Sequence, residues 1–111
     1  MLKSSALLVA LIGLVAVPAS AQQVYSPGNG VSLPVAVKEV HPMASAPATI
    51  AITCVVRPDG SVRSVTIASS PDSTLNQAAI RAMRQWQFKA GMKDGKPVPV
   101  RISVEMTFTH G

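Results

Sequence analysis

The clearest pattern in the chain lies near its end, where apolar and polar residues alternate. Apolar side chains occupy every second position from Val98 to Phe108, and polar residues such as Arg101 and Glu105 lie between them. A period of two places the two sets of side chains on opposite faces of a β-strand. The pattern therefore predicts a long last strand over residues 98–109, with one face buried and the other in water.

Three earlier segments show a shorter alternation of the same kind. Residues 31–38 carry valine or leucine at every second position and predict a first strand, at a sheet edge because Pro34 has no N–H to donate. Residues 50–57 and 62–68 flank the turn sequence Pro58-Asp59-Gly60. Two strands joined by such a turn predict an antiparallel hairpin.

Three segments lack a strand or helix pattern. Residues 22–30 are rich in Gly, Ser, Asn and Pro, and we expect a flexible lead-in to a domain over residues 31–111. Residues 41–48 hold two prolines and small side chains, which predicts a loop. Residues 93–97 read Lys-Asp-Gly-Lys-Pro and predict a second turn.

One segment, residues 75–86, has helical periodicity. Its apolar residues recur at helical spacing and are mostly alanine, so the helix can lie close to a sheet, with Trp86 filling one end. Ser73 or Thr74 can cap this helix, and Gln77 three residues after Thr74 fits the capping-box pattern. We expect one amphipathic helix of about twelve residues.

The order of these elements is strand, hairpin, helix, strand. That order predicts an α+β fold in two layers, with an antiparallel sheet of three to four strands and one main helix packed on one face.

The first 21 residues have a different character from the rest. They combine Lys3, an apolar run over residues 6–17, and small side chains at Ala19 and Ala21. This is the order of a secretory signal peptide, and we expect export with cleavage after Ala21. The alternative is an uncleaved inner-membrane anchor, but crossing the hydrocarbon takes about 20 apolar residues and this run is shorter.

Charge adds little to the functional picture. Ten Lys and Arg against five Asp and Glu give +5, and removal of Lys3 would leave nine against five, or +4. The basic residues are scattered and only four residues are aromatic, whereas nucleic-acid binders concentrate charge and interleave aromatic side chains. We therefore expect no nucleic-acid partner, and a solvated basic surface or attraction to an acidic partner instead.

No catalytic or metal-binding set of residues is recognisable. The two histidines, His41 and His110, lack spaced Cys, His or carboxylate partners, and the serine pair Ser69-Ser70 lacks the glycines of a nucleophile elbow. Cys54 alternates with apolar residues on one strand, which predicts a buried, unreactive thiol, with intermolecular pairing as the alternative. We expect no enzyme, metal or cofactor, although a small exported hydrolase or ligand-binding domain stays open as an alternative.

The second half of the chain resembles the TonB C-terminal domain over residues 50–109. The motifs that carry this resemblance are Pro58-Asp59-Gly60-Ser61-Val62, Ser69-Ser70, Leu75 with Ala78-Ala79 and Ala82, Trp86-Gln87-Phe88-Lys89, and Gly95-Lys96-Pro97-Val98-Pro99-Val100. Residues 27–40 are similar to the lead-in of some short periplasmic members.

The resemblance implies a non-catalytic periplasmic domain that takes part in energy-dependent transport across the outer membrane. Such a domain binds a short receptor segment by adding it as a strand to its own sheet, because an edge strand offers unpaired N–H and C=O groups. The last strand is the candidate, with the expected partner-binding residues Val100, Arg101, Ile102, Ser103, Val104 and Glu105.

Several alternatives stay open under this interpretation. The partner is an outer-membrane receptor segment or another envelope protein, and the same edge could instead serve a homodimer or be covered by the N-terminal segment. Membrane contact, and a membrane-anchored energy transducer, are expected only if the N-terminus is uncleaved. The chain departs from the family pattern at residues 41–48, which are too short for the Tyr-Pro-containing helix of the family, and at Ala90, where the family has Pro. A long Pro-rich spacer is also missing, so we expect binding rather than energy transduction by this chain alone.

Overall fold

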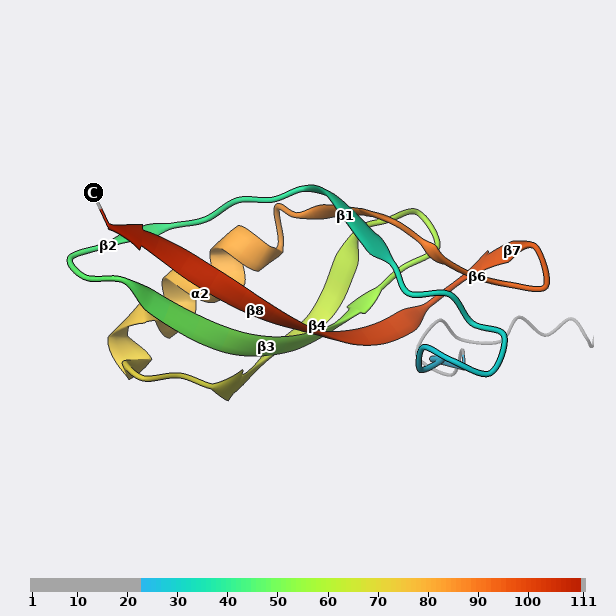
Figure 1. The fold of residues 1–111 in the computed structure, drawn as a ribbon, viewed down its shortest axis with the longest axis horizontal. Helices are drawn as coiled ribbons and strands as arrows, with labels where there is room; N and C mark the ends of the chain where they lie inside the picture. The colour runs from blue at the N-terminus through green and yellow to red at the C-terminus, as the bar shows by residue number, and fades with distance from the viewer. Residues whose placement is uncertain (1–22, 111) are drawn as a thin grey trace, which may run out of the picture.

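The computed structural model describes residues 23–110, and the predicted signal peptide lies outside them (Figure 1). The centre of the fold is a four-stranded sheet. Its strands, in spatial order, are β2 (Met43–Ala44), β8 (Val100–His110), β3 (Ala48–Val56) and β4 (Val62–Ser69). Strand β3 is antiparallel to β4 and to β8, but β2 runs parallel to β8. The expected antiparallel sheet is therefore a mixed one.

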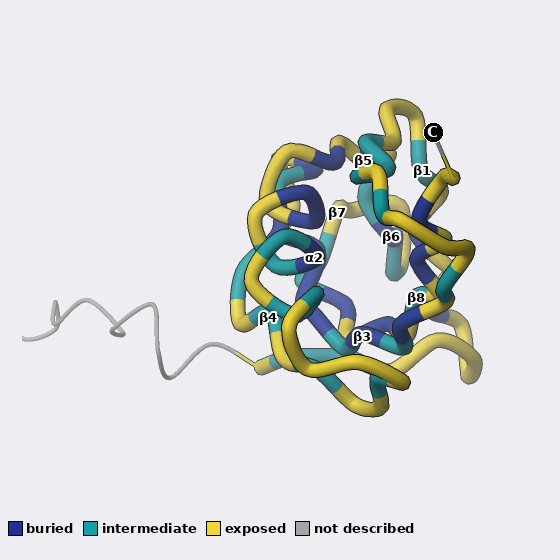
Figure 2. The backbone as a smooth tube through the Cα atoms, turned by 90° about the vertical axis from the view of Figure 1, so that its left-hand side faces the viewer, coloured by how far each residue is buried: buried dark blue, intermediate teal, exposed yellow. Residues whose placement is uncertain are grey.

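The β3–β8 ladder supplies most of the core, and the alternation predicted for the last strand is confirmed from Val100 onward. The predicted start at Val98 is wrong, because Val98 lies in a separate short hairpin and pairs with Gly91. The two strands pair without interruption from Ala48 opposite Phe108 to Val56 opposite Val100. Side chains at even positions of both strands lie on the same face, and almost all are buried, as the dark segments of β3 and β8 in Figure 2 show. The buried members are Ile50, Ile52, Cys54, Val56, Val100, Ile102, Met106 and Phe108.

The predicted turn between β3 and β4 forms, and it depends on Gly60. This residue has φ +89°, a conformation that residues with a Cβ rarely adopt. Its carbonyl accepts a hydrogen bond from the Phe88 N–H (2.9 Å), and a Cβ at this position would collide with the Phe88 carbonyl. The turn thereby ties the hairpin to the segment that follows the helix.

The helical segment is shorter than expected and begins at a different cap. A 3-10 turn, η3 (Ser73–Leu75), leads into α2 (Asn76–Met83). The cap is Asp72, whose Oδ1 accepts hydrogen bonds from the N–H and the hydroxyl of Thr74 (2.9 and 2.6 Å). A carboxylate that precedes the first turn satisfies N–H groups there, so Ser73 and Thr74 are not the caps.

The end of α2 places a large aromatic side chain in the core. After Met83 the backbone bonds tighten to three-residue spacing, with Trp86 N–H donating to the Met83 carbonyl (3.1 Å). Trp86 is buried, and its Nε1 donates to the Val40 carbonyl at 2.9 Å. Helix α2 packs against β4 and contributes buried alanines to the same core.

The first third of the domain departs most from the sequence-based expectations. The expected strand over residues 31–38 is reduced to β1 (Val35–Lys38), which pairs antiparallel with β5 (Gln87–Lys89). Ala36 faces the core opposite Phe88, so the alternate side chains of Leu33, Val35 and Val37 are exposed.

Two other segments that were predicted as a loop and a turn contain short strands in the structure. The expected loop over residues 41–48 contains β2, because it reaches the end of β8 and pairs there. Residues 93–97 form the predicted turn, here a hairpin between β6 (Gly91–Lys93) and β7 (Lys96–Val98).

Candidate partner-binding edge

Strand β8 directs alternate backbone groups to opposite sides. Its register pairs Ile102 with Cys54, and its even-numbered residues bond to β3. Because successive residues of a strand turn their N–H and C=O groups in opposite directions, the odd-numbered residues point away from β3. The N–H groups of Arg101 and Thr109 confirm this direction, since both donate to residues of the N-terminal segment.

The N-terminal segment occupies the first end of this outer edge. Tyr25 lies beside Val100 in a parallel bridge. Its N–H donates to the Pro99 carbonyl at 2.9 Å, and its carbonyl accepts from the Arg101 N–H at 2.8 Å. The expected lead-in thus lies against the domain and adds one residue of strand to β8.

The same segment returns to the far end of the edge. The Pro42 carbonyl accepts a hydrogen bond from the Thr109 N–H (3.0 Å), and β2 continues the pairing beside it. One residue earlier, Nδ1 of His41 contacts the Thr107 carbonyl at 2.8 Å. These contacts close the edge at its C-terminal end.

Between the two ends, the outer edge of β8 has no hydrogen-bond partner within the described part of the chain. The unpaired groups are the C=O of Arg101, the N–H and C=O of Ser103 and of Glu105, and the N–H of Thr107. We call this stretch the open edge. At about 3.4 Å per residue it is about 20 Å long.

The six residues expected at the partner-binding site fall into two sets. Arg101, Ser103 and Glu105 are exposed and carry the open edge. The other three, at positions 100, 102 and 104, turn their backbone to β3 and their side chains toward the core. Thr107 belongs to the open edge as well and was missed, although the same alternation could have assigned it.

His41 is held by acceptors on both ring nitrogens. Nδ1 contacts the Thr107 carbonyl and Nε2 contacts Oε1 of Glu39, both at 2.8 Å. A carbonyl and a carboxylate only accept, so both nitrogens act as donors when the ring is protonated. The pKa of His41 is accordingly raised, first by the Glu39 carboxylate and then by the Thr107 carbonyl. The ring also stands edge-on to Trp86, 5.4 Å between centroids.

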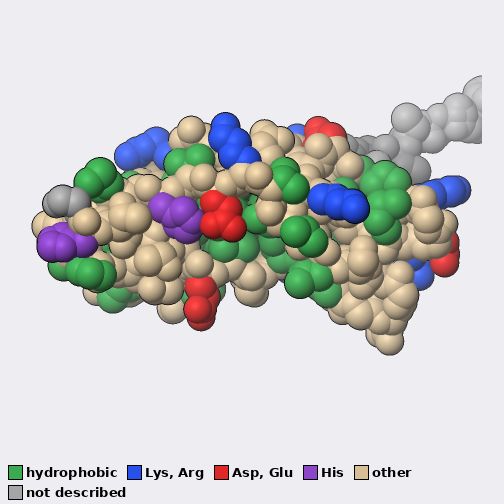
Figure 3. All heavy atoms as spheres, turned by 45° about the horizontal axis from the view of Figure 1, so that its top comes forward, with side chains coloured by type: hydrophobic (Ala, Val, Ile, Leu, Met, Phe, Trp, Pro, Cys, Tyr) green, Lys and Arg blue, Asp and Glu red, His purple; other side chains and the backbone are tan. Residues whose placement is uncertain are grey.

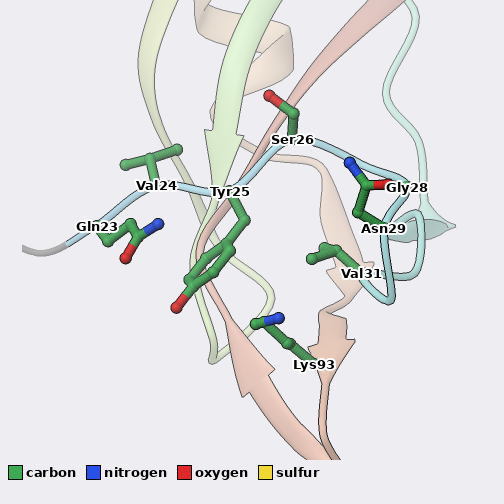
Figure 4. Close-up of a pocket in the computed structure, with 8 residues that line it drawn as sticks. All are labelled: Gln23, Val24, Tyr25, Ser26, Gly28, Asn29, Val31 and Lys93. Atoms are coloured by element: carbon green, nitrogen blue, oxygen red, sulfur yellow. The ribbon is translucent and has the colours of Figure 1, made fainter.

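A hollow of about 410 Å³ lies beside the first end of the open edge (Figure 4). It lies between the N-terminal segment and β6, with the Lys93 Nζ 5.8 Å from the centroid of the Tyr25 ring. Its lining residues are Gln23, Val24, Tyr25, Ser26, Gly28, Asn29, Val31 and Lys93. This lining has no carboxylate, histidine or cysteine. Its Ser26 hydroxyl therefore has no histidine or carboxylate beside it in the lining that could act as its general base.

The other candidate reactive groups in the described part of the chain do not form a catalytic or metal site either. Burial raises the pKa of the Cys54 thiol to about 11, which keeps it protonated and unreactive at neutral pH. Across residues 23–110 no three His, Cys, Asp or Glu side chains gather as a metal site would require. In the same range, no helix is long and apolar enough to cross a membrane.

Charge is spread rather than gathered on the visible surface. On the face shown in Figure 3, Lys and Arg side chains lie apart from one another among hydrophobic and neutral ones. A face of this kind lacks the concentrated basic stripe of a nucleic-acid binder.

The fold and the edge together define a small α+β domain whose central sheet ends in an incompletely paired strand. The family model described as Gram-negative bacterial TonB protein C-terminal matches residues 44–110, which is more than half of the chain. The protein belongs to this family, and its domain is of the non-catalytic, periplasmic kind that takes part in envelope transport. No curated protein matches the chain.

Proposed function

We propose that this protein binds an extended segment of an outer-membrane receptor, or of another envelope protein, by adding it as a strand to β8. The open edge carries this proposal. It is a row of unpaired N–H and C=O groups on exposed residues of a strand whose other side is fixed to the core. Main-chain pairing along such an edge gives affinity, and the flanking side chains give selectivity.

The pairing of the chain with itself supports this use of the edge. Tyr25 and β2 both add to β8 in the parallel direction, one at each end of the open edge. The outer side of β8 therefore already accepts short extended segments. An incoming strand would lie in line between the two.

The proposal includes export, which the character of the first 21 residues supports. The first 21 residues have the order of a signal peptide, and cleavage after Ala21 would release the domain into the periplasm. An uncleaved anchor would instead hold it at the inner membrane. N-terminal sequencing of the exported protein decides between them, since a retained Met1 would exclude cleavage.

The test of strand addition removes one outward N–H without touching the β3 ladder. Proline at an edge position is tolerated, and Ser103→Pro deletes the N–H at the centre of the open edge. Ser103→Ala is the matched control, because it removes the hydroxyl and keeps the N–H. Immobilised wild type, Ser103→Pro and Ser103→Ala are used to capture receptors from an outer-membrane extract.

We expect wild type and Ser103→Ala to capture the same receptors, and Ser103→Pro to recover about tenfold less, as for the loss of one main-chain bond with local distortion. Circular dichroism establishes that Ser103→Pro is folded. Equal recovery by a folded Ser103→Pro would rule out strand addition at this edge. Size-exclusion chromatography of the wild type detects the alternative, a homodimer paired through the same strand. Such a dimer would have twice the mass of the monomer, and Ser103→Pro would disrupt it.

A further inference from the structure

We propose that the open edge selects segments that carry an acidic residue and, four positions later, a basic residue. Between these two, the segment residues whose side chains point to the core face of the sheet are apolar. This inference rests on the proposed strand addition and specifies the partner. It follows from the register of β8 and from two exposed charges on it, Arg101 and Glu105.

The register of an added strand follows from the groups that are unpaired. In a parallel pair, each bonding residue donates to one residue of the neighbouring strand and accepts from the residue two positions later. A segment residue that donates to the Arg101 carbonyl and accepts from the Ser103 N–H therefore lies opposite Ile102. Two positions later, the next bonding residue uses Ser103 and Glu105, and the third uses Glu105 and Thr107.

This register places two segment residues beside the two charges. The residue that precedes the first bonding position lies opposite Arg101. Tyr25 pairs with Val100 in the parallel direction, so Ser26, the next residue of the chain, has to turn aside to leave room there. The segment residue four positions later lies opposite Glu105. Side chains directly opposite on one face of a sheet interact, favourably for opposite charges and unfavourably for like charges. An acidic residue in the first place and a basic residue in the second therefore match β8.

Neither charge is already compensated by the domain. On the β3 side, Arg101 lies opposite Val55 and Glu105 lies opposite Ala51, so no charged residue of β3 faces them. Within the described chain the one ion pair joins His41 and Glu39. The outer side of β8 is thus the side from which a partner can neutralise Arg101 and Glu105.

The bonding residues of the segment face the other side of the sheet. Their side chains would lie next to those of Ile102, Val104 and Met106, on the face that packs with α2 and Trp86. Val104 is only half-buried there, although its neighbours along the strand are buried. Apolar residues at these positions would cover Val104. The partner segment would therefore alternate between apolar residues and residues that are charged or polar.

The direction of the added strand is taken from the domain itself. Tyr25 at one end and β2 at the other both run parallel to β8. A segment in the same direction meets Arg101 before Glu105, so its acidic residue comes first.

Two synthetic seven-residue peptides of identical composition test the proposal. Both carry valine at the second, fourth and sixth positions and serine at the third and seventh. One has glutamate at the first position and lysine at the fifth, and the other has these two residues exchanged. Their binding to the full exported chain is measured by fluorescence anisotropy for wild type and for the doubly reversed variant Arg101→Glu with Glu105→Arg.

Wild type should bind the glutamate-first peptide about tenfold more tightly, since two attractive pairs replace two repulsive ones. The doubly reversed variant should prefer the lysine-first peptide by a similar factor, and raised salt should shrink both preferences. The wild type and the doubly reversed variant have the same net charge. Long-range attraction between domain and peptide therefore cannot account for a reversed preference.

Other outcomes overturn the inference in distinguishable ways. Equal binding of the two peptides, or an unchanged preference in the reversed variant, would show that the charges on β8 do not select. A lysine-first preference in wild type would exclude the parallel direction. Selective binding that survives Ser103→Pro would place the peptides elsewhere on the domain, and absence of binding by either peptide would count against the proposed function itself.

Discussion

The two edges of β8 are built from one alternating sequence but meet different surroundings. The edge toward β3 is paired continuously from Val100 to Phe108, and the side chains of those bonding residues form much of the core. Within residues 23–110, the outer edge is paired only at its ends, by Tyr25 and by the segment that contains His41 and β2. The edge toward β3 therefore contributes to the stability of the fold, and the outer edge offers backbone groups that are free to form hydrogen bonds.

This difference explains how β8 can be held rigidly on one side while backbone groups on its other side stay unpaired. The β3 ladder fixes the position of the groups on the outer edge, so the proposed binding would require little backbone ordering of the domain. The N-terminal segment covers the edge at two points without covering its centre. Three changes test how far the two edges are independent.

The largest effect on stability is expected from Trp86→Ala, because this side chain supports both the core and the segment that pairs with the outer edge. Trp86 fills the core under β8, and its Nε1 bond to the Val40 carbonyl holds the segment that reaches the far end of the outer edge. Loss of a buried tryptophan should lower the free energy of unfolding by about 3–5 kcal/mol. Chemical denaturation measures it.

A matched variant divides this loss between its two causes. Trp86→Phe keeps an aromatic ring in the core but removes the donor, so it should cost only about 1–2 kcal/mol. An unfolding midpoint of Trp86→Ala equal to that of wild type would mean that the side chain is not part of the core.

An intermediate effect is expected from moving a proline by one residue. Ile102→Pro removes an N–H that faces β3, so a buried carbonyl loses its partner and unfolding should become easier by about 1–3 kcal/mol or more. Ser103→Pro removes an N–H that faces solvent and should change the free energy of unfolding by less than about 1 kcal/mol. Thermal unfolding of both variants compares them directly. Equal destabilisation would show that the two edges are not distinct.

The smallest effect is expected from pH. The pKa of His41 is raised in the folded chain, by Glu39 first and by the Thr107 carbonyl second, above the ordinary value of 6.5. A raised pKa means that the stabilising contribution is complete below the unfolded value and is lost as the pH rises through the folded value. We expect a loss of about 1 kcal/mol or less over that range.

Titration of the His41 ring protons by NMR measures this effect, and Glu39→Gln is the control. Without the carboxylate the pKa of His41 should fall toward its ordinary value, while the contact with Thr107 is kept. A His41 pKa that does not respond to Glu39→Gln would remove the carboxylate as the main cause.

The central part of the fold could be predicted from the sequence because its signals are local. The alternation that defines β8, the turn at residues 58–60 and the buried Cys54 all depend on residues near one another in the chain, and the structure has each of them. The predicted helix forms, but it is shorter than expected and its cap is a different residue. Asp72 outcompetes Ser73 and Thr74 because its carboxylate reaches the first-turn N–H while they lie within the turn.

The N-terminal third could not be predicted because its pairing is decided at long range. Tyr25 meets Val100 and Met43 meets Thr109 across most of the chain, and no local pattern announces such contacts. The same limit applies to the candidate site. The sequence indicated the strand, but which of its backbone groups are unpaired depends on where residues 23–44 touch it. The exposure of Leu33 likewise follows from which face of β1 meets Phe88.

Strand β4 forms the opposite border of the central sheet, and its irregularity has a consequence for assembly. Its pairing with β3 shifts register twice, and Ser64 adopts a left-handed φ of 56°. Such bulges bend a border strand away from the straight geometry that another chain would need. The sheet is consequently one-sided. If a partner docks on β8 as proposed, the bulged border of β4 disfavours a second addition there, so we expect association to stop after a single step and not to propagate into a fibre.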